Sequence, residues 1–150
     1  MALHIDGETA EGRAFLKQLE QLEKLGLFVG FQDGSGSYAD GISVAQVAAW
    51  NELGNSRIPS RPFLRQSFEN HEPEIGRACE AQAKTLLTGG TAQTVYDALG
   101  VYMKGMVQKE IVSGGFVPNA PYTIRMKGSS TPLIDTGQMR QSVNYVIRDK

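Results

Sequence analysis

The strongest hydrophobic pattern in the chain runs from residue 91 to residue 112. Apolar side chains recur there at the i, i+3, i+4, i+7 spacing of one helix face over about five turns, at Ala92, Val95, Tyr96, Leu99, Met103, Met106 and Val107. This spacing predicts a long helix. Gly100 and Gly105 each cost such a helix roughly 1 kcal/mol relative to alanine. They suggest a neighbour packed too closely for a side chain, and the alternative is that they occur there by chance.

Shorter segments with helical spacing lie on either side of the long one. Residues 11–25 have apolar side chains on one helix face and charged or polar side chains on the other, which predicts a surface helix. We expect Thr9 to cap this helix and Gly26 to end it. Ser43 and Gln46 form a capping box that predicts a helix over 44–53. Further helices are predicted from Pro62 with Ser60 as the cap, from residue 73 or 74 to 87, and over 139–142. In the helix that ends near 87, we expect the inward side chains to be Ile75, Ala78, Cys79 and Leu86.

Two segments favour extended structure. Residues 27–32 (LFVGFQ) are aromatic and aliphatic, and residues 143–148 alternate apolar and polar types, so we expect both to be strands that pair with each other. A weaker strand signal covers 38–42. The prediction is an α+β fold with four to five helices packed against a small, mainly antiparallel sheet. We expect a single domain over 1–150 with two long loops, one at 33–42 and an arm at 113–133.

Charge is balanced overall and uneven along the chain. Fifteen Lys and Arg face sixteen Asp and Glu, a net charge of -1, which argues against a general nucleic-acid clamp. Residues 1–50 carry 3 basic and 7 acidic side chains (net -4), whereas residues 101–150 carry 7 basic and 3 acidic (net +4). The oppositely charged ends can attract each other within one molecule, or they can attract neighbouring copies packed head to tail in a ring.

The residue types that carry chemistry are sparse. A single cysteine, Cys79, rules out an internal disulfide, and with only His4 and His71 beside it no four-ligand zinc set of Cys and His exists. The glycine-rich stretches at 34–37 and 126–130 lack the spacing of a phosphate loop, so we predict no catalytic residue, cofactor or metal. The longest apolar run, 25–31, is too short to span a bilayer, and we expect no signal segment or membrane association.

Two blocks of the sequence carry a resemblance. One is Asn51-Glu52-Leu53-Gly54 followed by Ile58 to Leu64 (IPSRPFL), and the other is Pro132 to Gly137 (PLIDTG) ahead of a short helix and strand. In order and spacing, these blocks resemble the neck and tail-completion proteins of tailed bacteriophages and prophages. They cover about a third of the chain.

The resemblance implies a non-enzymatic assembly protein that joins the tail to the head or completes the end of the tail. It further implies an oligomeric ring, a hexamer by analogy with tail symmetry, built in the host cytoplasm and retained in the virion neck or tail. The expected partners are copies of this chain and other phage head or tail proteins, with no membrane, specific nucleic acid or small-molecule substrate. The candidate interaction residues are Asp33, Tyr38, Asp40, Arg57, Arg61, Phe116, Tyr122, Arg125, Lys127 and Asp135.

Several alternatives stay open at this stage. Pro59 and Pro62 restrict the backbone and could present Arg61 to a partner, or they could simply stiffen a corner that holds core aromatic side chains. The basic residues around this corner fit salt bridges better than a nucleic-acid stripe, because the two prolines interrupt the helix that such a stripe needs. The competing functions are a small phage enzyme acting on cell wall or nucleic acid, and a module that binds a host protein through exposed aromatic side chains such as Trp50.

Overall fold

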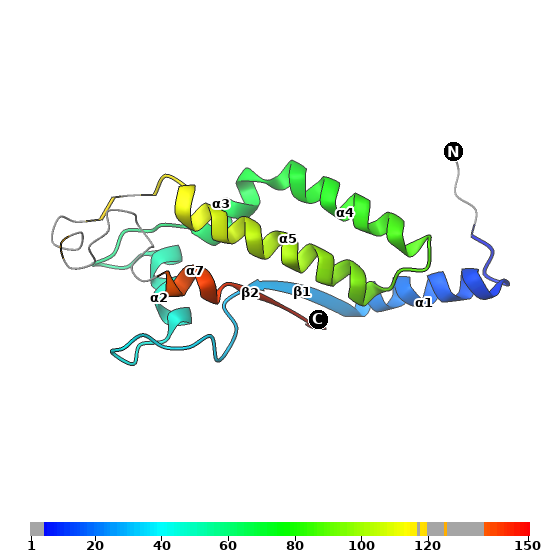
Figure 1. The fold of residues 1–150 in the computed structure, drawn as a ribbon, viewed down its shortest axis with the longest axis horizontal. Helices are drawn as coiled ribbons and strands as arrows, with labels where there is room; N and C mark the ends of the chain where they lie inside the picture. The colour runs from blue at the N-terminus through cyan, green and yellow to red at the C-terminus, as the bar shows by residue number, and fades with distance from the viewer. Residues whose placement is uncertain (1–4, 117, 120–124, 126–136) are drawn as a thin grey trace.

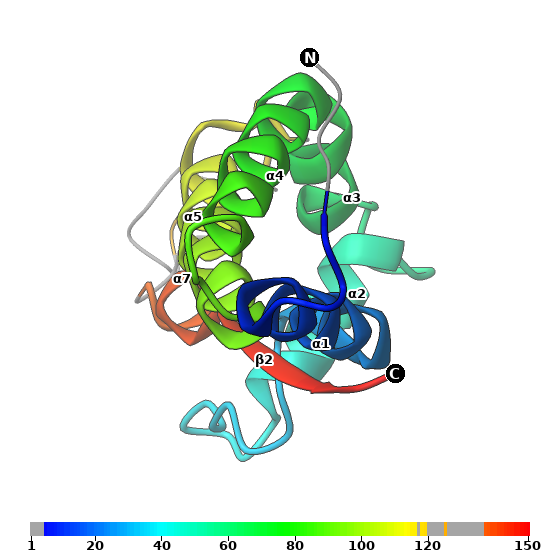
Figure 2. The same ribbon diagram turned by 90° about the vertical axis from the view of Figure 1, so that its right-hand side faces the viewer.

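The computed structural model describes residues 5–116, 118–119, 125 and 137–150. Its described elements are, in chain order, α1 (Ala10–Lys24), β1 (Leu25–Gly30), α2 (Val44–Leu53), α3 (Phe63–Asn70), α4 (Glu72–Leu86), α5 (Ala92–Ser113), α7 (Gln138–Ser142) and β2 (Asn144–Asp149). The molecule is elongated, and α5 runs along its middle with α4 on one side and the sheet on the other (Figures 1 and 2). The predicted α+β class is confirmed, with six helices in the described part rather than four to five.

The predicted strand pair is also confirmed. β1 and β2 form a two-stranded antiparallel sheet with continuous register from Leu25 opposite Asp149 to Gly30 opposite Asn144. β1 begins two residues earlier than predicted, because Leu25 is already extended (φ -86°, ψ 155°) and Gly26 lies inside the strand instead of ending α1. Gly26 is suited to this place, since a β-carbon there would come 2.9 Å from the ring of Phe28.

Three helices begin at side-chain caps, of which the sequence predicts two, Thr9 and Ser43. Thr9 accepts a hydrogen bond from the backbone N–H of Gly12, and Ser43 accepts one from Gln46. Thr91 forms a reciprocal capping box with Thr94 at the start of α5. Because each cap satisfies a backbone donor that the first helical turn leaves unpaired, these starts are encoded locally.

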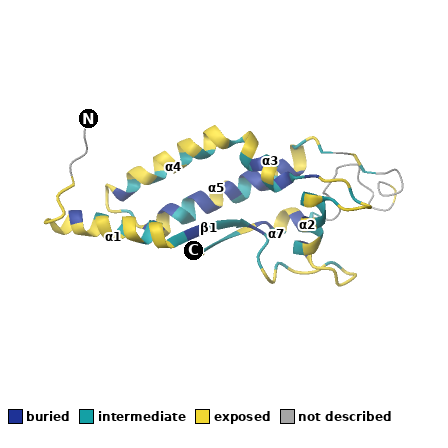
Figure 3. Ribbon diagram, turned by 180° about the vertical axis from the view of Figure 1, so that it is seen from behind, coloured by how far each residue is buried: buried dark blue, intermediate teal, exposed yellow. Residues whose placement is uncertain are grey.

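Buried side chains follow α5 as a stripe and divide into two clusters (Figure 3). One cluster joins α5 to α2, α3 and α7; its buried members are Val44, Ala48, Phe63, Val107, Ile111, Met139 and Val143. The other lies toward the start of α5; its buried members are Leu86, Val95, Leu99 and Met103, with partly buried side chains from α1, β1, α3 and α4 against them. One helix therefore supplies both halves of the core.

The two glycines of α5 differ. A β-carbon on Gly100 would lie 2.5 Å from Cγ of Tyr145, so the predicted close neighbour is there and belongs to β2. Among the described residues, nothing lies within 4 Å of a β-carbon built on Gly105, so the prediction of a close neighbour is wrong there.

Other predictions are corrected. Cys79 is exposed instead of buried, because it lies on the outer side of α4. Residues 38–42 form a turn, in which Gly41 N donates to Tyr38 O, closed by an isolated bridge between Ser37 and Ser43. Among the described helices, none is long and apolar enough to cross a membrane.

Candidate interaction site

The IPSRPFL block and the turn before it form a corner between α2 and α3, which we call the 51–65 corner. Gly54 ends α2 with φ of 72°, and a β-carbon there would lie 2.8 Å from Ser60 N. Asn55 then closes the turn, because its Oδ1 accepts from the N–H groups of Arg57 (2.8 Å) and Ile58 (2.9 Å). Both residues act locally. Gly54 adopts a positive φ that other residues rarely adopt, and the Asn55 side chain forms an Asx turn with the backbone that follows it.

Glu52 supplies the cap of the next helix from outside it. Its carboxylate accepts hydrogen bonds from the backbone N–H groups of Leu64 (2.8 Å) and Arg65 (3.1 Å) in the first turn of α3. A negative charge at this end of a helix also interacts favourably with the helix dipole. The prediction that Ser60 caps this helix is therefore wrong, and the Ser60 hydroxyl instead donates to Glu52 O at 2.9 Å.

Arg61 faces the interior of the corner. Its side chain is 7% exposed, and its guanidinium donates to Asn51 Oδ1 (3.4 Å) and to Pro118 O (3.3 Å). Its backbone N–H donates to Asn51 O. Burial lowers the pKa of Arg61 from its ordinary value, because desolvation penalises the charged form. Arg61 therefore ties the end of α2 to the chain beyond α5 and is not presented to solvent, which favours the rigid-corner interpretation.

The aromatic residue after the second proline anchors the corner. Phe63 is fully buried, and its ring packs edge-on against Phe31, with centroids 5.9 Å apart and planes at 83°. Edge-to-face contact of this kind is a preferred aromatic geometry. The corner is thus fixed at the backbone by Gly54 and Asn55, at the helix start by Glu52, and in the core by Phe63.

A buried carboxylate next to the corner joins α3 to α5. Glu110 is 6% exposed, and its Oε1 accepts from Gln66 Nε2 (2.7 Å) and Asn70 Nδ2 (3.2 Å). His71 Nδ1 lies 4.0 Å from Glu110 Oε2 and 2.8 Å from Ser67 O. The sequence pattern missed this cluster, because Glu110 is a polar position within an otherwise apolar helix face and its partners come from about 40 residues earlier.

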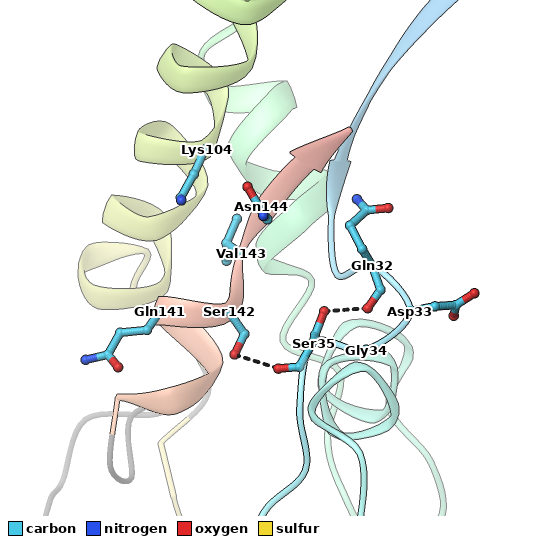
Figure 4. Close-up of a pocket in the computed structure, with 9 residues that line it drawn as sticks. All are labelled: Gln32, Asp33, Gly34, Ser35, Lys104, Gln141, Ser142, Val143 and Asn144. Atoms are coloured by element: carbon cyan, nitrogen blue, oxygen red, sulfur yellow. Dashed lines mark hydrogen bonds between the residues drawn. The ribbon is translucent and has the colours of Figure 1, made fainter. Parts of the chain in front are cut away.

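A shallow polar pocket of about 340 Å³ opens where the loop after β1 meets the start of β2 (Figure 4). Its lining residues are Gln32, Asp33, Gly34, Ser35, Lys104, Gln141, Ser142, Val143 and Asn144. The Ser142 hydroxyl donates to Ser35 O at 3.3 Å, and the Ser35 hydroxyl donates to Gln32 O. These two hydroxyls are therefore engaged with backbone carbonyls, and the charged side chains of the lining are Lys104 and Asp33.

The structure places the predicted interaction residues in different environments. Asp33, Asp40, Arg57 and Arg125 are exposed, whereas Tyr38 and Phe116 are half-buried and pack against the core cluster around Phe63. Tyr122, Lys127 and Asp135 lie outside the described residues. The loop at 33–42 and the 51–65 corner lie toward the end of the molecule opposite the N-terminus (Figure 1). Arg61 joins the corner to Pro118 from inside the fold, and of the predicted residues Tyr38 and Phe116 come together by packing against one core cluster.

Within the described residues, no group of three or more His, Cys, Asp and Glu side chains is arranged to hold a metal ion. No protein-family model matches the chain, and no curated protein or solved structure matches it.

Proposed function

We propose that this chain is a structural assembly subunit of a tailed phage or prophage that joins the tail to the head or completes the tail end as an oligomeric ring. The observation that carries the proposal is the 51–65 corner. The residues of the resembling block make specific contacts there: Glu52 caps α3, Gly54 and Asn55 make the turn, and Arg61 is buried.

The corner explains why such a block needs its residue types and spacing without any reacting group. Its hydrogen bonds run to backbone atoms and to Asn51, so the motif serves to fix geometry. Arg61 extends this geometry to Pro118, beyond the end of α5. A rigid corner that also holds the chain just after α5 suits a subunit that must bind its neighbours in one orientation.

Residues 1–50 and 101–150 carry net charges of -4 and +4. Within one copy the two segments already meet where β1 pairs with β2, so their net charges do not by themselves define oppositely charged faces. Contacts between neighbouring copies that join opposite charges weaken as salt screens them.

Deletion of the gene tests the proposal. Electron microscopy of the lysate should show filled heads and tails that are unjoined or unfinished, and the wild-type gene supplied in trans should restore joined particles. Complementation by the Glu52→Ala variant should fail or be impaired because the α3 cap is lost. The matched Glu69→Ala variant removes only an exposed ion pair to Arg65 and should complement. Normal infectious particles in the absence of the gene would refute the proposal.

A further inference from the structure

The two-stranded sheet leaves both of its edges without a strand partner in the described chain. Lys150 N donates to Lys24 O at 3.1 Å, so Lys24–Lys150, one position beyond the ladder, is a hydrogen-bonded pair. Antiparallel ladders alternate between hydrogen-bonded and non-hydrogen-bonded pairs. Counting from Lys24–Lys150, the pairs Gly26–Arg148 and Phe28–Val146 are therefore hydrogen-bonded. The intervening pairs, Leu27–Ile147 and Val29–Tyr145, are of the second kind, and their backbone groups point outward.

A second contact supports this assignment. Tyr145 N donates to the side-chain oxygen of its neighbour Asn144 at 2.9 Å, as expected for an N–H that points away from β1. At the other end, Leu25 O accepts from the Tyr96 hydroxyl at 3.2 Å, so α5 satisfies that carbonyl. No hydrogen bond within the described chain reaches the outward backbone groups of Leu27, Val29 or Ile147.

The β1 edge also lacks the usual devices that keep edge strands apart. Its sequence, LGLFVG, contains no charged residue and no proline, and its register with β2 runs through all six pairs without a bulge. Natural edge strands are commonly protected by such features, and an unprotected edge is a template for another strand. No helix or strand is drawn in front of β1 when the molecule is seen from behind (Figure 3).

The two edges are on opposite sides of the sheet, because β1 and β2 are its only strands in the described chain. A contact between the β1 edge of one copy and the β2 edge of the next therefore uses two different faces and continues from copy to copy. When the ring axis runs along the strands, rotation from one copy to the next leaves each strand's direction unchanged. β1 of one copy then runs antiparallel to β2 of the next, as it does to β2 of its own copy.

Ring closure selects this contact over pairing of two β1 edges. Two β1 edges would form a contact between identical faces, which ends at a dimer, whereas β1 against β2 joins different faces and continues around a ring. Charge does not oppose the contact, because β1 carries no charged residue.

We propose that the outward edge of β1 binds the outward edge of β2 from a second copy of this chain, so that the two-stranded sheet continues across the subunit boundary. The inference rests on the proposed ring of copies and names its interface. Backbone hydrogen bonds supply the contact, as in other cases of strand addition.

Residue-resolved amide hydrogen exchange at low salt tests the proposal when it is combined with light scattering over a range of protein concentrations. As oligomers form, exchange at Leu27, Val29 and Ile147 should slow by on the order of 100-fold, because these amides enter a ladder. The amides of Phe28 and Val146 serve as controls, since they are paired within one copy and should be protected throughout. An Ile147→Pro variant removes one outward donor and should weaken association about tenfold, whereas Ile147→Val retains the donor and should not.

The outcomes separate this inference from the proposed function. Oligomers that leave these three amides unprotected would overturn the strand contact and leave the ring intact. Protection at Leu27 and Val29 alone, in a dimer, would replace it with a β1–β1 contact. A chain that remains monomeric at its highest soluble concentration, with all three amides exchanging freely, would contradict self-pairing. Failure of the proposed function appears separately, as normal particles from the deletion lysate.

Discussion

A single methyl group added at Gly100 tests the packing of α5 against β2. In an open helical position, replacing glycine with alanine raises the free energy of unfolding by up to about 1 kcal/mol. At Gly100 the added carbon would lie 2.5 Å from Cγ of Tyr145, closer than such contacts occur. The ring cannot withdraw freely, because its hydroxyl donates to Asp97 Oδ1 at 3.1 Å and its backbone belongs to β2.

The expected magnitude follows from two opposing effects. Overpacking in a core costs about 1–3 kcal/mol, which outweighs the helical gain, so Gly100→Ala should lose about 1–2 kcal/mol. Gly105→Ala is the matched control in the same helix, since no atom of the described residues lies within 4 Å of its added carbon, and it should gain about 0.5–1 kcal/mol. For a chain of this size each kcal/mol corresponds to about 2–4 °C in Tm.

Thermal and denaturant unfolding of the two variants measure the difference. The variants should shift Tm in opposite directions, and Tyr145→Leu should relieve the penalty of Gly100→Ala in a double-mutant cycle. An equal rise in Tm for both variants would refute the close approach of β2 to α5.

Three further perturbations probe the polar contacts. Glu52→Ala should lower the free energy of unfolding by about 1–2 kcal/mol, because the α3 cap is lost. The control Glu69→Ala should change it by less than about 0.5 kcal/mol. Equal losses for the two variants in urea unfolding would contradict the capping role of Glu52. Glu110→Ala should cost about 2–3 kcal/mol by the same measurement, because buried amide donors lose their acceptor, and a neutral result would show that they are satisfied otherwise. The hydrogen bond to Asp97, followed by desolvation and by the Asp97 charge, raises the pKa of Tyr145, so folding favours the protonated phenol. This contribution to stability is present below about pH 10 and is lost as pH rises through the raised folded value; Tyr145→Phe should flatten that alkaline limb, and an unchanged limb would exclude Tyr145 as its source.

Local signals made much of the fold predictable. Thr9 and Ser43 each satisfy a backbone donor three residues later, so the caps of two helices could be predicted from the sequence. The helix α5 was predicted from its apolar periodicity, and its Thr91 cap was not predicted. The pairing of β1 and β2 was also predicted correctly. Both segments are rich in aliphatic and aromatic residues typical of strands, and the sequence offers few other segments with which either could pair. Gly26 misled the prediction of where α1 ends, since glycine serves close packing inside a strand as well as helix termination.

The interaction site was less predictable because its contacts are not local. Glu52 caps a helix 12 residues later, and Glu110 binds side chains from α3, so no short window of sequence contains either arrangement. Arg61 illustrates the same limit, since the prolines beside it predict a stiff corner correctly but do not determine whether its side chain points out or in. That direction depends on Asn51 and Pro118, which come together only in the fold.

The most direct measurement of the central claim is cryo-electron microscopy of purified particles, with mass spectrometry to count copies of this chain. The account predicts a ring of copies at the neck or at the end of the tail, with the β1 edge of each copy against the β2 edge of the next. Absence of the chain from mature, infectious particles would contradict the claim that it is a building subunit of the virion.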